Sequence, residues 1–93
     1  MNDGIKEEQG KLNYEINWEF IENVAKRMSL NKDKYPPFNW QQKIDEDKLK
    51  QALTRHFIEI MKGNYSDEQH LGHLYAIVCN AMMLEYQIKN FKD

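Results

Sequence analysis

The most regular apolar pattern in the chain lies between Ser66 and Phe91, where apolar residues recur on two sides of one helical run. Residues three and four apart share a face of a helix. The first stripe comprises Leu71, Leu74, Tyr75, Val78, Met82 and Tyr86. The second comprises His73, Ile77, Asn80, Leu84 and Ile88. A helix that is apolar on two sides needs cover on two sides, so we expect this helix to be the buried centre of the fold.

The predicted start of this helix carries local signals. Ser66 can accept hydrogen bonds from the free amides of a first turn, and Gln69 stands where a capping-box side chain reaches back. Asp67 and Glu68 place negative charge at the positive end of the helix dipole. We therefore predict that the helix begins just after Ser66.

Two polar residues interrupt the second stripe. His73 and Asn80 are seven residues apart, so they lie nearly above one another along the helix axis. Buried polar groups in proteins have hydrogen-bonding partners. We therefore expect these two side chains to face a partner, water or a ligand.

Two shorter helices are predicted upstream. The first begins at Asn17 and ends near Leu30, with Glu19 and Glu22 favouring its N-terminal end. Its apolar positions are Phe20, Ile21, Val24, Ala25 and Met28. The second begins after the capping residue Asp45 and stops at Gly63. Its apolar stripe comprises Leu49, Ala52, Leu53, His56, Phe57, Ile60 and Met61.

The connections between these helices define the expected architecture. Gly63, Asn64 and Tyr65 form a tight connection, which makes the second and third helices antiparallel neighbours. We predict an all-α fold with one short helix and a longer central hairpin, in a single domain of residues 11–93. Residues 1–10 are polar and form a mobile tail, and residues 11–16 alternate as a short extended arm.

Composition narrows the functional classes. The chain has 93 residues, 41% of them hydrophobic, and a net charge of −2, which disfavours binding to duplex nucleic acid. No segment approaches the about 20 apolar residues of a membrane span. The single cysteine, Cys79, lies among apolar neighbours and is expected to be a small buried residue in a reducing cytoplasm. Because a single core of this size is marginally stable, we expect a homo-oligomer.

Histidines and carboxylates are the first candidates for chemistry. His56, His70 and His73 can converge across the hairpin, but zinc sites need three or four ligands with a marked spacing, so we expect no metal there. A magnesium-dependent hydrolase needs clustered carboxylates on facing helices. The two longer helices offer only Glu59 and Glu85 beyond their first turns.

A polar pocket for a phosphorylated, base-bearing ligand is the other candidate. The guanidinium of Arg55 suits phosphate oxygens, and aromatic side chains around Pro36 and Pro37 offer stacking faces. The predicted ligand-binding residues are Tyr35, Asn39, Trp40, Arg55, His56, His73 and Asn80. The alternative is that Trp40 and Phe38 close one end of the core while Arg55 pairs with Glu59.

The order of several short motifs resembles a known family. The chain carries Gly10-Lys11-Leu12-Asn13-Tyr14-Glu15-Ile16, Lys34-Tyr35, Asn39-Trp40, Ala52-Leu53, Arg55-His56, Gly63, Asp67, His73 and Cys79-Asn80-Ala81. This order resembles the small helical domain of phage and prophage proteins named for the N-terminal part of dATP/dGTP diphosphohydrolases. The resemblance implies handling of purine nucleotides inside an infected bacterium.

Two positions depart from the family pattern, and the loss of a histidine at one of them, together with the shortage of paired carboxylates, favours binding over hydrolysis. Prolines follow Lys34-Tyr35 where a glycine turn is expected, and Ala76 stands where relatives often carry a second histidine. The leading hypothesis is therefore a cytoplasmic protein that binds, and sequesters, a purine nucleotide or a cyclic or modified nucleotide signal of bacterial immunity, without a cofactor. One alternative is a magnesium-dependent diphosphohydrolase releasing pyrophosphate from purine deoxynucleoside triphosphates. Another is a protein inhibitor of a host factor, acting through an aromatic surface around Phe38 and Trp40.

Overall fold

The computed structural model describes residues 14–30, 39–66 and 72–92. These ranges contain α2 (Trp18–Leu30), the 3-10 helix η1 (Asn39–Gln41), α3 (Glu46–Met61) and α4 (His73–Phe91). They contain no strand, so the predicted all-α class is confirmed. The predictions for the tail of residues 1–10 and for residues 31–38, which include the two prolines, lie outside the described ranges.

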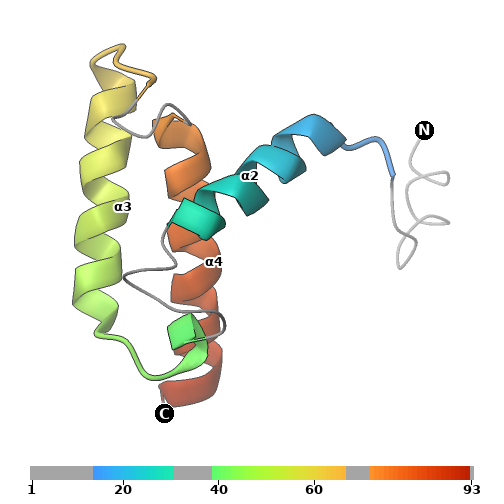
Figure 1. The fold of residues 1–93 in the computed structure, drawn as a ribbon. Helices are drawn as coiled ribbons and strands as arrows, with labels where there is room; N and C mark the ends of the chain where they lie inside the picture. Colours follow the sequence, from blue (N-terminus) through green and yellow to red (C-terminus); the bar gives the residue numbers. More distant parts are fainter. Residues whose placement is uncertain (1–13, 31–38, 67–71, 93) are drawn as a thin grey trace, which may run out of the picture.

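The helices α3 and α4 form the predicted antiparallel hairpin (Figure 1). The helix α2 packs across α4, and the N-terminal end of α2 points away from the hairpin. The short helix η1 lies beside the C-terminal end of α4. Among the described helices, none combines the length and the apolar character that crossing a membrane requires.

The predicted boundaries of the first two helices are confirmed by their caps. The side-chain oxygen of Asn17 accepts a hydrogen bond from the amide of Phe20 at 3.2 Å, just before α2. Asp45 likewise accepts from the amide of Asp47 at 2.9 Å, just before α3. After α3, Gly63 adopts a φ of 87°, a conformation that favours glycine and ends the helix.

The predicted start of α4 is wrong. The helix begins at His73, and its capping residue is Gly72 rather than Ser66. Gly72 has a φ of 84°, and a Cβ at this position would lie 3.0 Å from the carbonyl oxygen of Tyr65. That same carbonyl accepts a hydrogen bond from the amide of His73 at 2.9 Å. The connection is therefore longer than the predicted tight turn, while Asp67, Glu68 and Gln69 lie outside the described residues.

The buried face of α4 also differs from both predicted stripes. Its buried residues are Ala76, Cys79, Asn80, Met83 and Gln87. Of these, only Asn80 belongs to a predicted stripe, and the other four lie between the two stripes. Leu74 and Ile88, from one stripe each, are 48% and 40% exposed. The reason is that α2 and α3 approach α4 from neighbouring directions, so the face between them is the covered one. Small residues on this face allow the helices to approach closely.

The other helices show the same shift at the edges of their stripes. On α3, Leu49 is buried as predicted, whereas Phe57 and Met61 are 50% and 70% exposed. On α2, Ile21 is exposed although Phe20 and Val24 are half-buried. The core of the described ranges therefore contains only four buried hydrophobic residues. They are Leu49, Ala76, Cys79 and Met83.

Contacts with Tyr75 and Cys79 hold α2 on α4. The rings of Phe20 and Tyr75 meet edge to face at 5.0 Å, and the amide group of Asn23 donates to the Tyr75 hydroxyl at 3.2 Å. The Cys79 thiol donates to the carbonyl oxygen of Val24 at 3.5 Å. Burial raises the pKa of this thiol to about 11, an effect that the positive charge of Arg27 opposes. Cys79 is thus the small buried residue that its neighbours predicted.

Candidate functional site

His56 and His73 contact each other at the end of the hairpin where the connection joins α3 to α4. His56 lies on the half-buried side of α3, and His73 is the first residue of α4. Their Nδ1 atoms are 2.8 Å apart, and their ring centroids are 5.0 Å apart at an angle of 45°. The predicted convergence of histidines across the hairpin is therefore confirmed for this pair. His70 lies outside the described residues.

A contact between two Nδ1 atoms constrains the protons of both imidazoles. One Nδ1 carries a proton and donates it, and the other Nδ1 is the acceptor. The accepting ring must then carry its own proton on Nε2 when it is neutral. If the donating ring is also protonated on Nε2, the pair is a cation with two N–H donors besides the shared bond. While the contact persists, at least one Nε2–H of the pair therefore lies outside the shared bond.

Arg55 precedes this pair on α3 and is exposed. No acidic side chain of the described residues forms an ion pair with it, so the alternative of an Arg55–Glu59 pair is not what the structure shows. Glu59 instead lies 3.9 Å from the Lys62 ammonium and accepts a hydrogen bond from the Asn64 amide at 3.0 Å. The guanidinium thus stands one residue from the histidine pair with its donors directed to solvent or a ligand.

Asn80 lies deeper in the hairpin than the histidine pair. It is only 8% exposed and follows His73 by seven residues, about 10 Å along the helix axis. Its amide is therefore part of the interior between the packed helices. The structure places it on the same side of α4 as His73, as the seven-residue spacing predicted.

Asn39 and Trp40 lie at the other end of the hairpin. Trp40 packs edge to face on Tyr86, with ring centroids 5.2 Å apart. Tyr86 follows His73 by thirteen residues, a separation of about 20 Å along α4. The structure thus separates these two predicted ligand-binding residues from Arg55, His56 and His73, and Tyr35 is outside the described residues.

Gln87 is a buried polar residue that the sequence analysis missed. Its side-chain oxygen accepts from the amide of Ile44 at 2.9 Å. Its side-chain nitrogen donates to the carbonyl oxygens of Trp40 at 3.2 Å and Gln42 at 2.7 Å. The signal was present, because Gln87 follows Asn80 by the same seven residues that separate Asn80 from His73. Through these three hydrogen bonds, Gln87 links the segment from Trp40 to Ile44 to the C-terminal end of α4.

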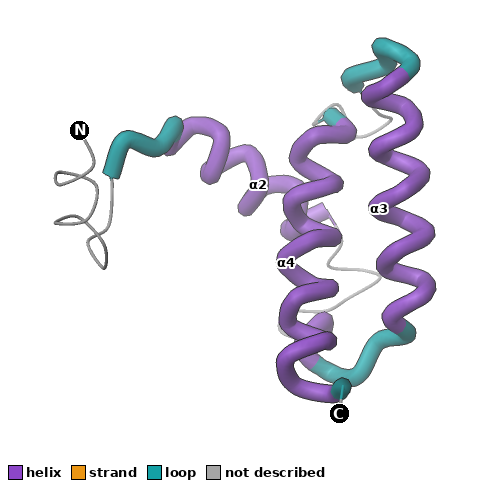
Figure 2. Tube along the Cα trace, turned by 180° about the vertical axis from the view of Figure 1, so that it is seen from behind, coloured by secondary structure: helices purple, strands orange, loops and turns teal. Residues whose placement is uncertain are grey.

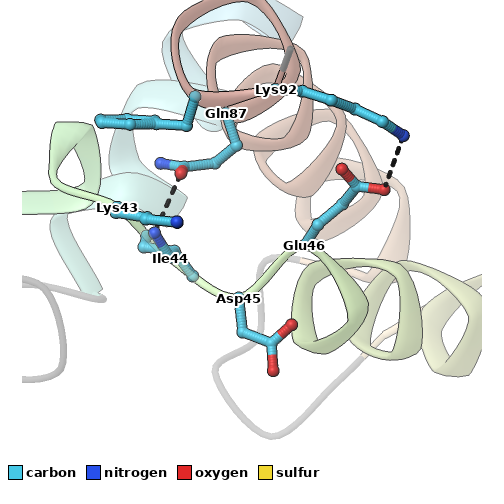
Figure 3. A pocket seen from close by; sticks show the side chains of 7 residues that line it. Lys43, Ile44, Asp45, Glu46, Gln87 and Lys92 are labelled. Atoms are coloured by element: carbon cyan, nitrogen blue, oxygen red, sulfur yellow. Dashed lines mark hydrogen bonds and ion pairs between the residues drawn. The ribbon is translucent and has the colours of Figure 1, made fainter.

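A pocket of about 520 Å³ lies beside Gln87 (Figure 3). Its walls are Lys43, Ile44, Asp45, Glu46, Gln87, Phe91 and Lys92. The Glu46 carboxylate is 2.7 Å from the Lys50 ammonium and 3.6 Å from that of Lys92. The hydrogen bond from Lys50 lowers the pKa of Glu46, and Glu46 in turn raises the pKa of Lys50. Two of the charged residues that line this pocket, Glu46 and Lys92, are therefore paired with each other.

The side chains of residues 14–30, 39–66 and 72–92 do not cluster as a metal site. Within these ranges no group of three or more histidine, cysteine, aspartate or glutamate side chains could hold a metal ion. The pair of His56 and His73 supplies two nitrogen atoms that already face each other. That the chain binds no metal ion stays a prediction.

Comparison with known proteins agrees with the motif order of the chain. The family model described as dATP/dGTP diphosphohydrolase, N-terminal, matches residues 1–93. The chain belongs to this family. A dATP/dGTP diphosphohydrolase from Salmonella phage PMBT28 is 32% identical over 88 residues, which is 94% of this chain and 30% of that relative. The chain thus spans less than a third of the relative's length, and no solved structure matches it.

Membership in the dATP/dGTP diphosphohydrolase N-terminal family confirms the resemblance on which the sequence analysis relied. The match covers the three helices, so the histidine pair, Asn80 and Gln87 all belong to the family domain. The larger part of the phage relative lies outside the match. The family match therefore identifies this domain, but it does not show what the domain does.

Proposed function

We propose that this domain binds a purine nucleotide through its phosphates at the end of the hairpin where His56 and His73 meet. The observation that carries the proposal is the Nδ1 contact of 2.8 Å between these two rings. It fixes the orientation of both imidazoles and leaves at least one Nε2–H of the pair outside the shared bond. Phosphate oxygens are acceptors that such donors suit.

Arg55 supports the same location. Its guanidinium is exposed one residue before His56, and a planar guanidinium binds phosphate oxygens with two parallel hydrogen bonds. The purine part of the proposal comes from the family, whose description and phage relative both carry the names dATP and dGTP.

The side chains near His56 and His73 favour nucleotide binding without hydrolysis. A diphosphohydrolase that uses magnesium needs carboxylates to hold the ion that bridges the phosphates. Glu59 is the acidic residue of α3 closest in sequence to the pair, and it already contacts Lys62 and Asn64. The proposed role is therefore to hold a purine nucleotide, or a signal derived from one, intact.

Calorimetric titration with dATP, dGTP and a cyclic purine dinucleotide tests the proposal. We expect binding well below millimolar for at least one of them, and a loss of tenfold or more in Arg55→Ala. The matched control is Lys89→Ala, an exposed cation near the far end of α4. Absence of binding at millimolar ligand, where the binding free energy is only about 4 kcal/mol, refutes the proposal. Equal affinity in both variants refutes the location.

A second assay separates binding from hydrolysis. The protein is incubated with dATP or dGTP and magnesium, and pyrophosphate is measured over time. We expect the nucleotide to remain intact. Release of pyrophosphate that is lost in Arg55→Ala would replace the binding proposal with the diphosphohydrolase alternative.

A further inference from the structure

One long face of α4 is covered by none of the other described helices. Leu74, Met82 and Ile88 are 48%, 39% and 40% exposed, and Ala81 between them is exposed as well. These residues lie opposite the face that α2 and α3 cover. Figure 2 shows α4 from this side, with none of the described helices in front of it. We call Leu74, Val78, Ala81, Met82 and Ile88 the outer face of α4.

Three residues of the outer face are spaced symmetrically about Ala81. Leu74, Ala81 and Ile88 are seven residues apart, so the three lie almost in line along the axis. Ala81 is the midpoint, with one large aliphatic residue on each side. The row therefore presents the same pattern when it is read from either end, and a row of this kind is self-complementary in an antiparallel pair. The small side chain at the centre lets two helices come close together.

We propose that a second copy of this chain docks on the outer face of α4, with the two α4 helices antiparallel and a two-fold axis at Ala81. Leu74 of one copy then packs near Ile88 of the other, at both ends of the contact. The hairpins of the two copies form four helices in which each α4 is covered on both sides. This arrangement supplies the two-sided cover that the apolar pattern of the helix requires.

The charges of the outer face are compatible with such a contact. Glu85 is an exposed acidic residue on the same side of α4 as these five residues, and its carboxylate is already 3.8 Å from the Lys89 ammonium. In an antiparallel pair centred on Ala81, the two copies of Glu85 lie on opposite sides of the axis, about 12 Å apart along it. Like charges are therefore not brought together. A parallel pair would instead place the two copies of Glu85 side by side.

The size of the contact sets the expected strength. The row from Leu74 to Ile88 is about 21 Å long, and one helix is roughly 10 Å wide. A standard protein interface buries about 800 Å² on each partner, which is more than one such row supplies. We therefore expect an equilibrium between one and two copies whose average mass rises with concentration.

Sedimentation equilibrium over a concentration series tests the proposal. We expect the native average mass to rise towards twice that of one chain, and Ala81→Glu to remain a monomer because two carboxylates would meet at the axis. The matched control is Ile58→Glu on α3, which replaces a residue that is 46% exposed. It should associate as the native protein does. Circular dichroism checks that both variants keep native helix content.

The result that overturns the proposal is a native protein that stays monomeric at the highest concentration, or an Ala81→Glu variant that associates as the native protein does. A native assembly larger than two copies supports the proposal if Ala81→Glu reduces its mass and overturns it otherwise. None of these outcomes depends on nucleotide binding, so a failure here is distinct from a failure of the proposed function.

Cross-linking through single cysteines tests the antiparallel arrangement. In a Cys79→Ala background, Ala81→Cys should form a covalent dimer on mild oxidation because the two thiols meet at the axis. Leu74→Cys should not, since its two copies are separated by about 21 Å along the axis. Efficient cross-linking through position 74 alone, or none through position 81, would contradict the arrangement.

Discussion

Two methionines, Met83 and Met61, differ in burial. Replacing each with alanine therefore tests how much burial contributes to stability. Met83 is 1% exposed, whereas Met61 at the end of α3 is 70% exposed. Truncating a buried methionine to alanine costs about 2–5 kcal/mol, because buried methylene groups are lost and a cavity remains. Surface substitutions of this kind stay within about 0.5 kcal/mol. We therefore expect Met83→Ala to be strongly destabilising and Met61→Ala to be nearly neutral.

The magnitude is large for a domain of this size. With only four buried hydrophobic residues in the described ranges, the free energy of unfolding should be near the lower end of about 5–15 kcal/mol. A loss of 1 kcal/mol lowers the Tm of such a domain by about 4–8 °C. The assay is thermal unfolding followed by circular dichroism, at one fixed protein concentration because association would raise the Tm.

A third variant keeps this test informative if Met83→Ala does not fold. Met83→Leu conserves most of the volume and should cost less than about 1.5 kcal/mol. The ranking expected for the Tm is therefore Met61→Ala highest, Met83→Leu next and Met83→Ala lowest. Equal Tm values for the two alanine variants, or a larger decrease in Tm for Met61→Ala, would refute the burial of Met83 on the buried face of α4.

Two further predictions concern the end of the hairpin near Gln87. Because Lys50 lowers the pKa of Glu46 in the folded protein, this carboxylate stabilises the fold above the ordinary carboxyl pKa of about 4.3, and the contribution is lost as the pH falls through the lowered pKa. Glu46→Gln should therefore lower the Tm at neutral pH by an amount that vanishes in acid, and a constant difference at all pH values would contradict the pairing. Gln87→Met should cost about 1–3 kcal/mol by leaving its backbone partners unpaired and should accelerate hydrogen exchange at the Ile44 amide, so unchanged exchange there would count against the fastening role.

Helix boundaries were predictable where their signals are local. Asn17 and Asp45 cap the helices that follow them, and Gly63 ends α3, because each effect involves only the adjacent turn. The start of α4 was not predictable in this way. Ser66 carries the signature of a cap, yet His73 bonds to the Tyr65 carbonyl and Gly72 turns the chain into the helix. That arrangement depends on how the connection folds back.

Periodicity predicted that α4 is apolar on two sides but not which side is buried. Burial depends on the directions from which α2 and α3 approach, and those directions are set by contacts such as Phe20 with Tyr75 that join distant segments. The small residues Ala76 and Cys79 contribute little to a pattern of large apolar side chains, so the pattern did not mark them as buried. They are nevertheless buried, because they permit close packing.

The candidate site was predictable in part. The pairing of His56 with His73 follows from their positions on antiparallel neighbours, and the family follows from the order of the motifs. The sequence left the location of Trp40 open between a ligand pocket and one end of the core, because its position after a proline-containing segment does not show which way the chain turns. Its packing on Tyr86 places it at the end of α4 remote from the histidines.

The spacing of the interhelical contacts along the chain implies an order of folding. His56 and His73 are 17 residues apart, whereas Ile44 and Gln87 are 43 apart and Val24 and Cys79 are 55 apart. Closing a loop of 55 residues costs about 1 kcal/mol more chain entropy than closing one of 17. We therefore expect the hairpin to form first from its histidine end, the connection before α3 to fasten next, and α2 to dock last on a face that the hairpin has already completed.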